Sequence, residues 1–301
     1  MPSKKILVIG SSNTDMTVRV KQLPRPGETV LGCDFVMGQG GKGANQAVAA
    51  KRLGGDVTFV CKVGQDIFGD NSLSEYKKEG LVTDHILRSG KPSGVALIPV
   101  SADGENSIVV ASGANADFSV EDVEKTLLAV GDFDILLLQL EIPVASVAAA
   151  ARLAHERGAM VVLNPAPCSP LPEEIFRNID LFIPNETELS NFTGMPVDSL
   201  DEVKKACALT QEKGVRQLIV TLGSQGSLLY AGDESEVIPA KKVKAVDTTA
   251  AGDTFCGGLC VGLAEGKSLR EAALFATAAA ALTVQKAGAQ NALPYRNELM
   301  E

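Results

Sequence analysis

The sequence predicts an α/β protein with a doubly wound, mostly parallel sheet flanked by helices, accompanied by a second, small sheet. Short apolar runs of strand length recur along the chain and are separated by segments of helix length, which is the pattern of a parallel sheet. The run from Lys5 to Ile9 is unbroken and ends at Gly10, as a central strand buried on both faces does. Segments with alternating or β-branched residues interrupt this order before residue 112.

These interrupting segments predict the small sheet. Turn residues such as Asp103-Gly104 separate them, which is typical of antiparallel strands. The helix and strand alternation resumes at Val57 to Lys62, so the small sheet should stand over the main one. A small sheet with an apolar face needs a partner to cover it, which favours a dimer. The four expected strands cover residues 14–20, 29–37, 94–100 and 106–111.

From Ser119 onward the alternation is regular and favours a doubly wound parallel sheet. Residues 226–230 and 236–239 are typical of an antiparallel hairpin at its edge. The alanine-rich segment from Ala272 to Val284 is interrupted by Thr and flanked by charge, which favours a buried helix over a membrane span. The expected parallel strands cover residues 135–138, 160–163, 181–183 and 218–221.

Length and composition narrow the class of protein. We expect a single domain over residues 1–301, with small-sheet strands inserted at about 14–37 and 94–111. The 28 Lys and Arg against 37 Asp and Glu give a net charge of −9, which disfavours nucleic acid and anionic membranes and favours a small-molecule partner. Two His and six Cys without a CxxC pair disfavour a zinc site or a Ser-His-Asp triad. Without a signal-peptide core or a membrane span, the protein should be soluble and cytoplasmic, with reduced thiols.

The segment from Asp247 to Gly258, DTTAAGDTFCGG, joins a loop to an apolar helix. Small residues at a helix start leave backbone amides free, and the helix dipole favours an anion there. Asp253 would repel such an anion unless it serves as a base beside a phosphoryl group. The alternative is an ordinary acidic residue in the first turn of a helix.

A second glycine-rich turn, Gly38 to Asn45, also opens into a helix that ends at Gly54, and two such turns suggest two converging substrates. Asn13 and Asp15 follow the first strand at its carboxyl end, where ligands of open α/β sheets bind. The alternative for this pair is an Asx turn.

The two glycine-rich segments, GGKGAN and DTTAAGDTFCGG, resemble the two signatures of the PfkB carbohydrate kinases, whose small sheet is a lid over the sugar and often a dimer contact. The resemblance covers nearly the whole chain and implies ATP-dependent phosphorylation of D-ribose at O5, giving D-ribose 5-phosphate. Alternatives are 2-deoxyribose, fructose, a nucleoside, or a non-catalytic sugar or nucleotide sensor; aromatic residues make up only 4%, which suits a nucleoside poorly. Further matching stretches are 12–15, 26–29, 94–97, 111–115, 139–141, 164–167, 184–188 and 286–290.

The resemblance implies a catalytic and a sugar-binding set. Asp253 would take the proton of the sugar hydroxyl, while amides would hold the developing charge. Lys42 could instead be a solvated loop lysine, and Glu141 could merely cap the helix that follows it. The amides belong to Ala250, Ala251, Gly252 and Asp253, and the implied sugar ligands are Asn13, Asp15, Gly41, Lys42, Asn45, Glu141 and Asp253.

For the nucleotide, Asn185 and Glu188 match the family's Asn-x-x-Glu pattern, which organises Mg²⁺ and phosphates through water. The same pair could form a helix capping box, and both roles could hold. No Walker A pattern occurs, which excludes a P-loop kinase. The remaining implied nucleotide residues are Thr221, Gly223, Ser224, Gly226 and Gly252.

The family also implies a monovalent cation site, for K⁺, beside the anion hole. Asp247 would supply its carboxylate, and the other ligands would be backbone carbonyls. Where the family often has a Ser hydroxyl, this chain has Ala292, so one ligand is missing or replaced by water. The carbonyls are those of Thr249, Thr283, Lys286 and Gly288.

Overall fold

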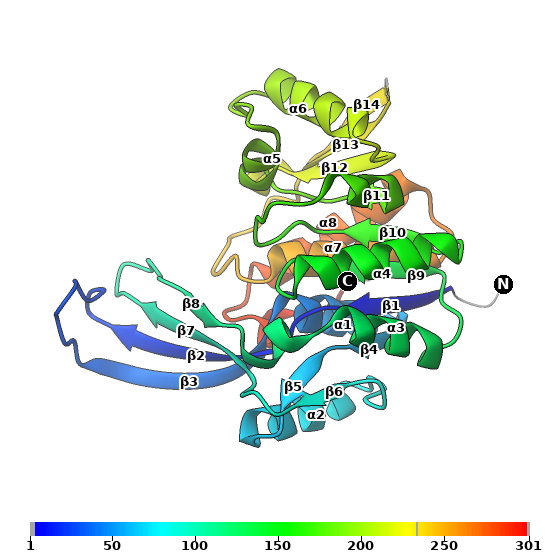
Figure 1. Cartoon of the computed structure of the whole chain (residues 1–301). Helices are drawn as coiled ribbons and strands as arrows, with labels where there is room; N and C mark the ends of the chain where they lie inside the picture. The colour runs from blue at the N-terminus through cyan, green and yellow to red at the C-terminus, as the bar shows by residue number, and fades with distance from the viewer. Residues whose placement is uncertain (1–3, 233, 300–301) are drawn as a thin grey trace.

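The computed structural model describes residues 4–232 and 234–299, so the ends of the expected domain, residues 1 and 301, lie outside the described residues. A mixed sheet with the order β14-β13-β12-β11-β10-β9-β1-β4 forms its centre. All pairings from β4 to β12 are parallel, and β13 and β14 add an antiparallel edge, as expected (Figure 1). The strands of this sheet are β1 Lys5–Ile9, β4 Asp56–Val60, β9 Ile135–Leu138, β10 Met160–Leu163, β11 Leu181–Phe182, β12 Gln217–Thr221, β13 Ser227–Ala231 and β14 Glu234–Ile238.

Helices cover both faces of this sheet, which makes it doubly wound. One core cluster joins α1, α7 and α8 to one face, and the other joins α3, α4, α5 and α6 to the opposite face. The α-helices are α1 Lys42–Arg52, α2 Ile67–Lys78, α3 Val120–Ala129, α4 Val144–Glu156, α5 Glu186–Thr193, α6 Leu200–Glu212, α7 Ala251–Ala264 and α8 Leu269–Thr283. Short 3-10 helices are η1 Gly113–Asp117, η2 Glu173–Asn178, η3 Gly223–Gln225, η4 Gln290–Ala292 and η5 Arg296–Leu299.

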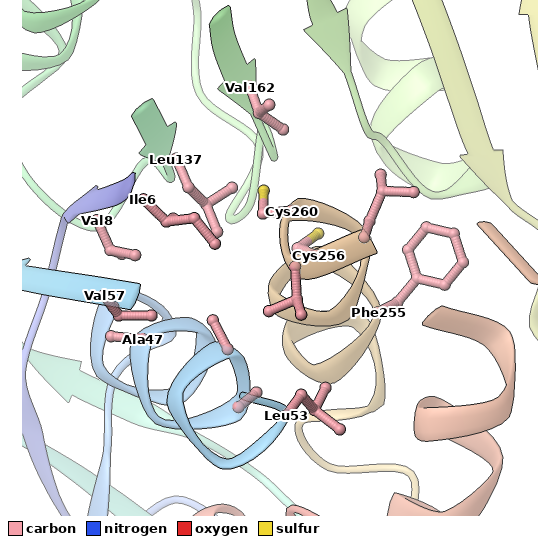
Figure 2. Packing of buried hydrophobic residues seen from close by; sticks show 14 of the residues in the cluster. Ile6, Val8, Ala47, Leu53, Val57, Leu137, Val162, Phe255, Cys256 and Cys260 are labelled. Atoms are coloured by element: carbon pink, nitrogen blue, oxygen red, sulfur yellow. The ribbon is translucent and has the colours of Figure 1, made fainter. Parts of the chain in front are cut away.

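Strand β1 shows why the sequence run from Lys5 to Ile9 is unbroken. Ile6 and Val8 belong to the cluster under α1 and α7, whereas Leu7 and Ile9 belong to the cluster under α3 and α4. Figure 2 shows the first cluster, in which strand side chains point toward Cys256 and Cys260 of α7. The strand is therefore buried on both faces, and the cluster on one face holds α1 and α7 with their N-termini at the carboxyl edge.

A four-stranded sheet with the order β3-β2-β7-β8 projects from the side of the main sheet (Figure 1). We call it the lid sheet. The expected antiparallel pairing holds for β2 with β3 and for β7 with β8, but β2 and β7 are parallel, because both strands leave the main body in the same direction. Its strands are β2 Asn13–Val20, β3 Gly32–Gly40, β7 Gly94–Val100 and β8 Val109–Ala111, and a small third sheet pairs β5 Lys62–Gly64 with β6 Leu87–Ser89.

The expected buried helix near Ala272 is α8, whose alanines pack against α7 in the core. In the described part of the chain, no helix has the length and apolar character needed to cross a membrane.

Candidate active site

Most predicted site residues gather where the carboxyl ends of β1 and β9 meet the starts of α1 and α7. Asn13 begins β2 just after β1, Glu141 follows β9, Lys42 begins α1, and Asp253 lies in the first turn of α7. Their charges act on one another, since Asp253, Glu141 and Glu188 all raise the pKa of Lys42 against the opposing effect of burial. Residues far apart in the sequence thus form one ionic cluster.

The start of α1 is held by Glu141. The amide of Lys42 donates to Glu141 Oε2 at 2.9 Å, and Ser11 Oγ donates to the same oxygen at 2.5 Å. The amide of Gly43 in turn donates to Ser11 Oγ at 3.3 Å. Glu141 therefore caps α1 across space, and the alternative in which it caps the following helix is wrong because Pro143 occupies the N-cap of α4.

Glycine is required at this helix start because β1 and α1 approach closely. A Cβ at Gly41, whose φ is +89°, would lie 2.8 Å from the amide nitrogen of Asn13. A Cβ at Gly43 would lie 2.5 Å from the amide nitrogen of Ser11. The glycines thus bring the α1 amides against the chain that carries the predicted sugar ligands.

Asn13 and Asp15 lie in strand β2, so the Asx-turn alternative is wrong. The side chain of Asn115 holds the segment through which the chain passes into the lid sheet. Asn115 Oδ1 accepts the amide of Ser12 at 2.9 Å, and its Nδ2 donates to Ser12 O at 3.1 Å and to Asn13 Oδ1 at 2.7 Å. The side-chain oxygen of Asn13 is thereby engaged, which orients the side chain and leaves Asn13 Nδ2 to donate elsewhere.

Asp15 is an unusual carboxyl group. Burial, followed by the charges of Glu141 and Asp253, raises its pKa to about 7. Gly40 makes room for it, since a Cβ there would lie 2.2 Å from its carboxylate oxygens. Lys42 is half-buried, and the charges of Asp253, Glu141 and Glu188 raise its pKa against burial, which favours the sugar-ligand prediction over a solvated lysine. Several acceptors and one strong donor in a confined space suit a ligand with several hydroxyl groups.

The start of α7, where an anion hole is predicted, leaves backbone amides open. Ala250 at the N-cap has a φ of 59°, the only positive φ of a non-glycine residue in ranges 4–232 and 234–299. The amide of Ala251 reaches Thr248 O at 3.3 Å, whereas those of Gly252 and Asp253 donate to no acceptor among the described residues. A left-handed alanine costs about 1–2 kcal/mol, and the turn it makes leaves these two amides pointing out of the helix.

Asp253 is 7% exposed and makes both of its carboxylate contacts with α1. Oδ1 accepts Gln46 Nε2 and Oδ2 accepts Asn45 Nδ2, each at 3.0 Å. Asp253 lies in the first turn of α7, but its side chain does not cap that helix and contacts α1 instead. The carboxylate stands directly beside the open amides, as a base beside a phosphoryl group would.

The predicted nucleotide residues line the neighbouring strand ends. Asn185 and Glu188 form a reciprocal capping box at α5, with bonds of 2.7 and 2.9 Å, so the capping alternative is confirmed. Burial raises the pKa of Glu188, Lys42 lowers it and Asp253 raises it, so this cap also lies within the ionic cluster. Thr221 N donates to Pro184 O at 2.9 Å and brings the next loop alongside. In that loop Gly223 and Ser224 are exposed in η3, and Gly226 ends it.

The predicted cation ligands come from two loops that the structure joins. Gly288 N donates to Asp247 Oδ2 at 2.8 Å, and Thr249 N donates to Asp247 Oδ1 at 2.9 Å. These bonds lower the pKa of Asp247 against the effect of burial. Thr283 ends α8 and Lys286 follows it, and Val284 O accepts the amide of Val246 at 2.7 Å. Ala292 is fully buried and offers no hydroxyl.

Carboxylate and carbonyl oxygens are the ligand type that hard cations prefer, so the donor set at these two loops fits such an ion. Across the described ranges, no cluster of three or more His, Cys, Asp or Glu side chains is placed to hold a metal by itself.

Several buried polar residues around this cluster have no role that the sequence alone predicts. Asn115, Gln139 and Asn164 lie within stretches that resemble the family, and Gln46 directly follows Asn45. Each is buried or half-buried and hydrogen-bonded to a predicted site residue or to its neighbour. Their place beside the motif residues is the signal that points to them.

The arrangement is that expected of a phosphotransferase. A buried carboxylate, an open helix N-terminus and side chains suited to a ligand with several hydroxyl groups meet at the carboxyl edge of the main sheet. A family model described as pfkB family carbohydrate kinase matches residues 3–296. The chain belongs to this family.

Individual relatives match this chain over nearly its full length. A protein named ribokinase from Haemophilus influenzae is 42% identical over 299 residues, covering 99% of this chain and 98% of the relative. A deoxyribokinase from Salmonella typhimurium is 38% identical over 291 residues, covering 96% and 95%. A solved structure, Arabidopsis thaliana ribokinase complexed with ribose and ATP, has a TM-score of 0.88 at 35% identity, covering 100% of this chain and 98% of the other.

Proposed function

We propose that the protein transfers the γ-phosphoryl group of ATP to O5 of D-ribose, giving D-ribose 5-phosphate. One observation carries the chemistry: the Asp253 carboxylate lies beside the unpaired amides of Gly252 and Asp253, with Lys42, Glu141 and Asp15 facing the same space. The ribokinase name of relatives that match over full length, one of them seen with ribose and ATP, supports ribose as the sugar.

In the proposed mechanism, Asn13, Asp15, Lys42 and Glu141 bind the sugar hydroxyls and orient O5 toward Asp253. Asp253 accepts the O5 proton as the oxygen attacks the γ-phosphorus. The amides of Gly252 and Asp253 stabilise the charge that spreads over the transferring group. The rigid placement of these groups, rather than covalent chemistry, accelerates the reaction.

Mg²⁺ supplies charge neutralisation on the ATP phosphates when bound, and Asn185 and Glu188 would hold it through water. Thr221, Gly223, Ser224 and Gly226 form the loop that we assign to the nucleotide. For K⁺, the ligands would be the Asp247 carboxylate and the carbonyls of Thr249, Thr283, Lys286 and Gly288. Because Ala292 has no hydroxyl, we expect a weaker dependence on K⁺ than a site with a serine ligand would give.

We further infer a single kinase domain whose lid sheet closes on the sugar and joins a second copy of the chain. Both faces of the lid carry exposed apolar side chains, since neighbouring residues of β3 point to opposite faces. Phe35 is 61% and Val36 58% exposed. One face can cover the sugar while the other is buried in a dimer.

The second candidate substrate is 2-deoxyribose, favoured by the deoxyribokinase relative at 38% identity. The two sugars differ by one hydroxyl group. A site that hydrogen-bonds this hydroxyl loses affinity for the sugar without it, because buried polar groups are then left unpaired.

The test is ADP release with Mg-ATP on ribose, 2-deoxyribose, fructose and adenosine, with and without K⁺. We expect the highest kcat/KM on ribose. A higher value on 2-deoxyribose would keep the mechanism and change the substrate. Sugar binding without turnover on any of the four would overturn the kinase proposal in favour of a sensor.

A further inference from the structure

A row of buried amide side chains leads away from Asp253 through Gln46 to Gln139. We propose that Gln46 is the positioning residue of the Asp253 base and that Gln139 sets the orientation of Gln46. The inference rests on the proposed kinase function. Gln46 is fully buried, so it acts on the reaction through Asp253 and not by touching the sugar.

The amide nitrogen of Gln46 has two acceptors. It donates to Asp253 Oδ1 at 3.0 Å and to Asn164 Oδ1 at 3.1 Å. Asn164 cannot present its nitrogen instead, because its Nδ2 donates to Ile183 O at 2.8 Å. Both hydrogens of Gln46 Nε2 are therefore used, and the carboxylate of Asp253 receives one of them.

The amide oxygen of Gln46 completes the assignment. It accepts Gln139 Nε2 at 2.6 Å. Gln139 is fully buried at the end of β9 and has little room to turn, since a Cβ at Gly10 would lie 2.1 Å from its Oε1. As long as Gln139 presents a donor, Gln46 keeps its oxygen toward β9 and its nitrogen toward Asp253.

Burying the side chain of Gln139 has a free-energy cost that its own packing does not explain. Its Oε1 has no hydrogen-bond partner among the described residues, and an unpaired buried acceptor is unfavourable. An apolar side chain of similar size would avoid this cost. The amide is useful at this position for the donor that it presents to Gln46, and the three side chains form a relay from β9 through α1 to the base in α7.

The relay predicts a loss of rate without a loss of binding. With Gln139→Met, Gln46 Oε1 loses its buried donor, so the side chain that holds the Asp253 carboxylate is no longer anchored to β9 and the carboxylate loses its fixed orientation. We expect kcat to fall about tenfold to a hundredfold, while KM for sugar and ATP changes less than about threefold. Single-turnover measurements ensure that the rate reports chemistry and not product release.

A double-mutant cycle tests whether Gln139 acts through Gln46. Gln46→Met should lower kcat at least as much, and adding Gln139→Met to it should lower kcat no further. Ser146→Ala is the control. Ser146 is equally buried and donates to Phe118 O at 2.6 Å, but it lies away from the base, so kcat should stay at the wild-type value.

If Gln139→Met does not fold by circular dichroism, Gln139→Leu removes the donor with another apolar side chain. It should lower kcat more than tenfold. Wild-type kcat in a folded Gln139 variant, equal rises in both KM values with kcat unchanged, or additive losses in the double variant would each overturn the relay. Failure of the wild-type enzyme to phosphorylate any sugar would overturn the kinase proposal itself.

Discussion

The N-termini of α1 and α7 are built alike but are used differently. Neither N-cap residue, Gly41 or Ala250, caps its helix with a side chain, and each has a positive φ. At α1 the first amides are occupied by Glu141 and Ser11. At α7 the amides of Gly252 and Asp253 have no acceptor among the described residues.

The difference shows what decides whether a helix N-terminus binds a ligand. Both helices offer amides and a favourable dipole. The α1 terminus is neutralised by a carboxylate of the protein itself, which fixes Glu141 beside the sugar site. In the first turn of α7, the carboxylate of Asp253 faces the side-chain amides of Asn45 and Gln46 instead. Only α7 is left to receive an external anion.

The largest effect is expected at the α7 terminus. Asp253→Asn removes the proton acceptor and should lower kcat about a hundredfold to ten-thousandfold, while ATP affinity is unchanged or higher because a negative charge is lost. Steady-state kinetics and calorimetric ATP titration measure the two effects. Asp201→Asn, an exposed first-turn residue of α6, should leave kcat unchanged. A drop in ATP affinity equal to the drop in kcat would contradict the assignment of Asp253 as base.

At the α1 terminus the effect should appear in sugar binding. Glu141→Gln keeps the shape but removes the charge that holds the Lys42 amide and faces Lys42. We expect KM for the sugar to rise about tenfold to a hundredfold and stability to fall about 1 kcal/mol.

A matched variant separates these two consequences. Glu202→Gln removes the charge of the capping box at α6, where no substrate is expected. It should cost comparable stability in thermal unfolding without changing KM. If Glu141→Gln lowered stability but left KM unchanged, Glu141 would serve only to cap α1.

Asp15, which lies over the α1 turn, predicts a pH effect. Its pKa is raised to about 7, so the native state keeps a proton that the unfolded chain releases above about pH 4. Stability from this group is therefore present below about pH 4 and is lost as the pH rises toward 7. Asp15→Asn should stabilise the protein by about 1–2 kcal/mol at pH 8, with the gain vanishing near pH 4, and should weaken sugar binding. Unfolding curves over this range that ran parallel for both proteins would refute the shift.

The smallest effect concerns the backbone of the α7 turn. Ala250→Gly relieves the left-handed conformation but adds freedom to the unfolded chain, so stability should rise by at most about 1 kcal/mol. Ala251→Gly, one residue later in helical conformation, should lower stability by about the same amount. Opposite signs in denaturant unfolding would confirm that the turn at Ala250 is strained, and equal signs would contradict it.

The parallel strands of the main sheet could be predicted from the sequence because they are short, largely apolar runs. Runs such as Lys5 to Ile9 are buried on both faces, and no other element fits an apolar segment of that length. The parallel pairing of β2 with β7 was not predicted. Local alternation identifies a strand but does not tell in which direction its neighbour leaves the body.

The two glycine-rich helix starts could also be predicted, because a cluster of glycines and small residues directly before a helix indicates a turn with accessible backbone amides. Contacts between residues far apart in the sequence could not be predicted. The sequence suggests Glu141 as a cap for its own helix, whereas it caps α1, about a hundred residues earlier in the chain. Gln139 lies in a stretch that resembles the family, but its role becomes visible only when Gln46 is seen opposite to it.

The close contact of β1 with α1 limits how the enzyme can be redesigned. At Gly10, Gly41 and Gly43 a single methyl group would lie within 3 Å of neighbouring atoms, so directed evolution of sugar preference will find almost no tolerated variation there. Residues 33–37 of β3 and the whole of β8 are exposed and have no such restriction. A mutant library aimed at new acceptor alcohols is best placed on β3 and β8, with the glycines left untouched.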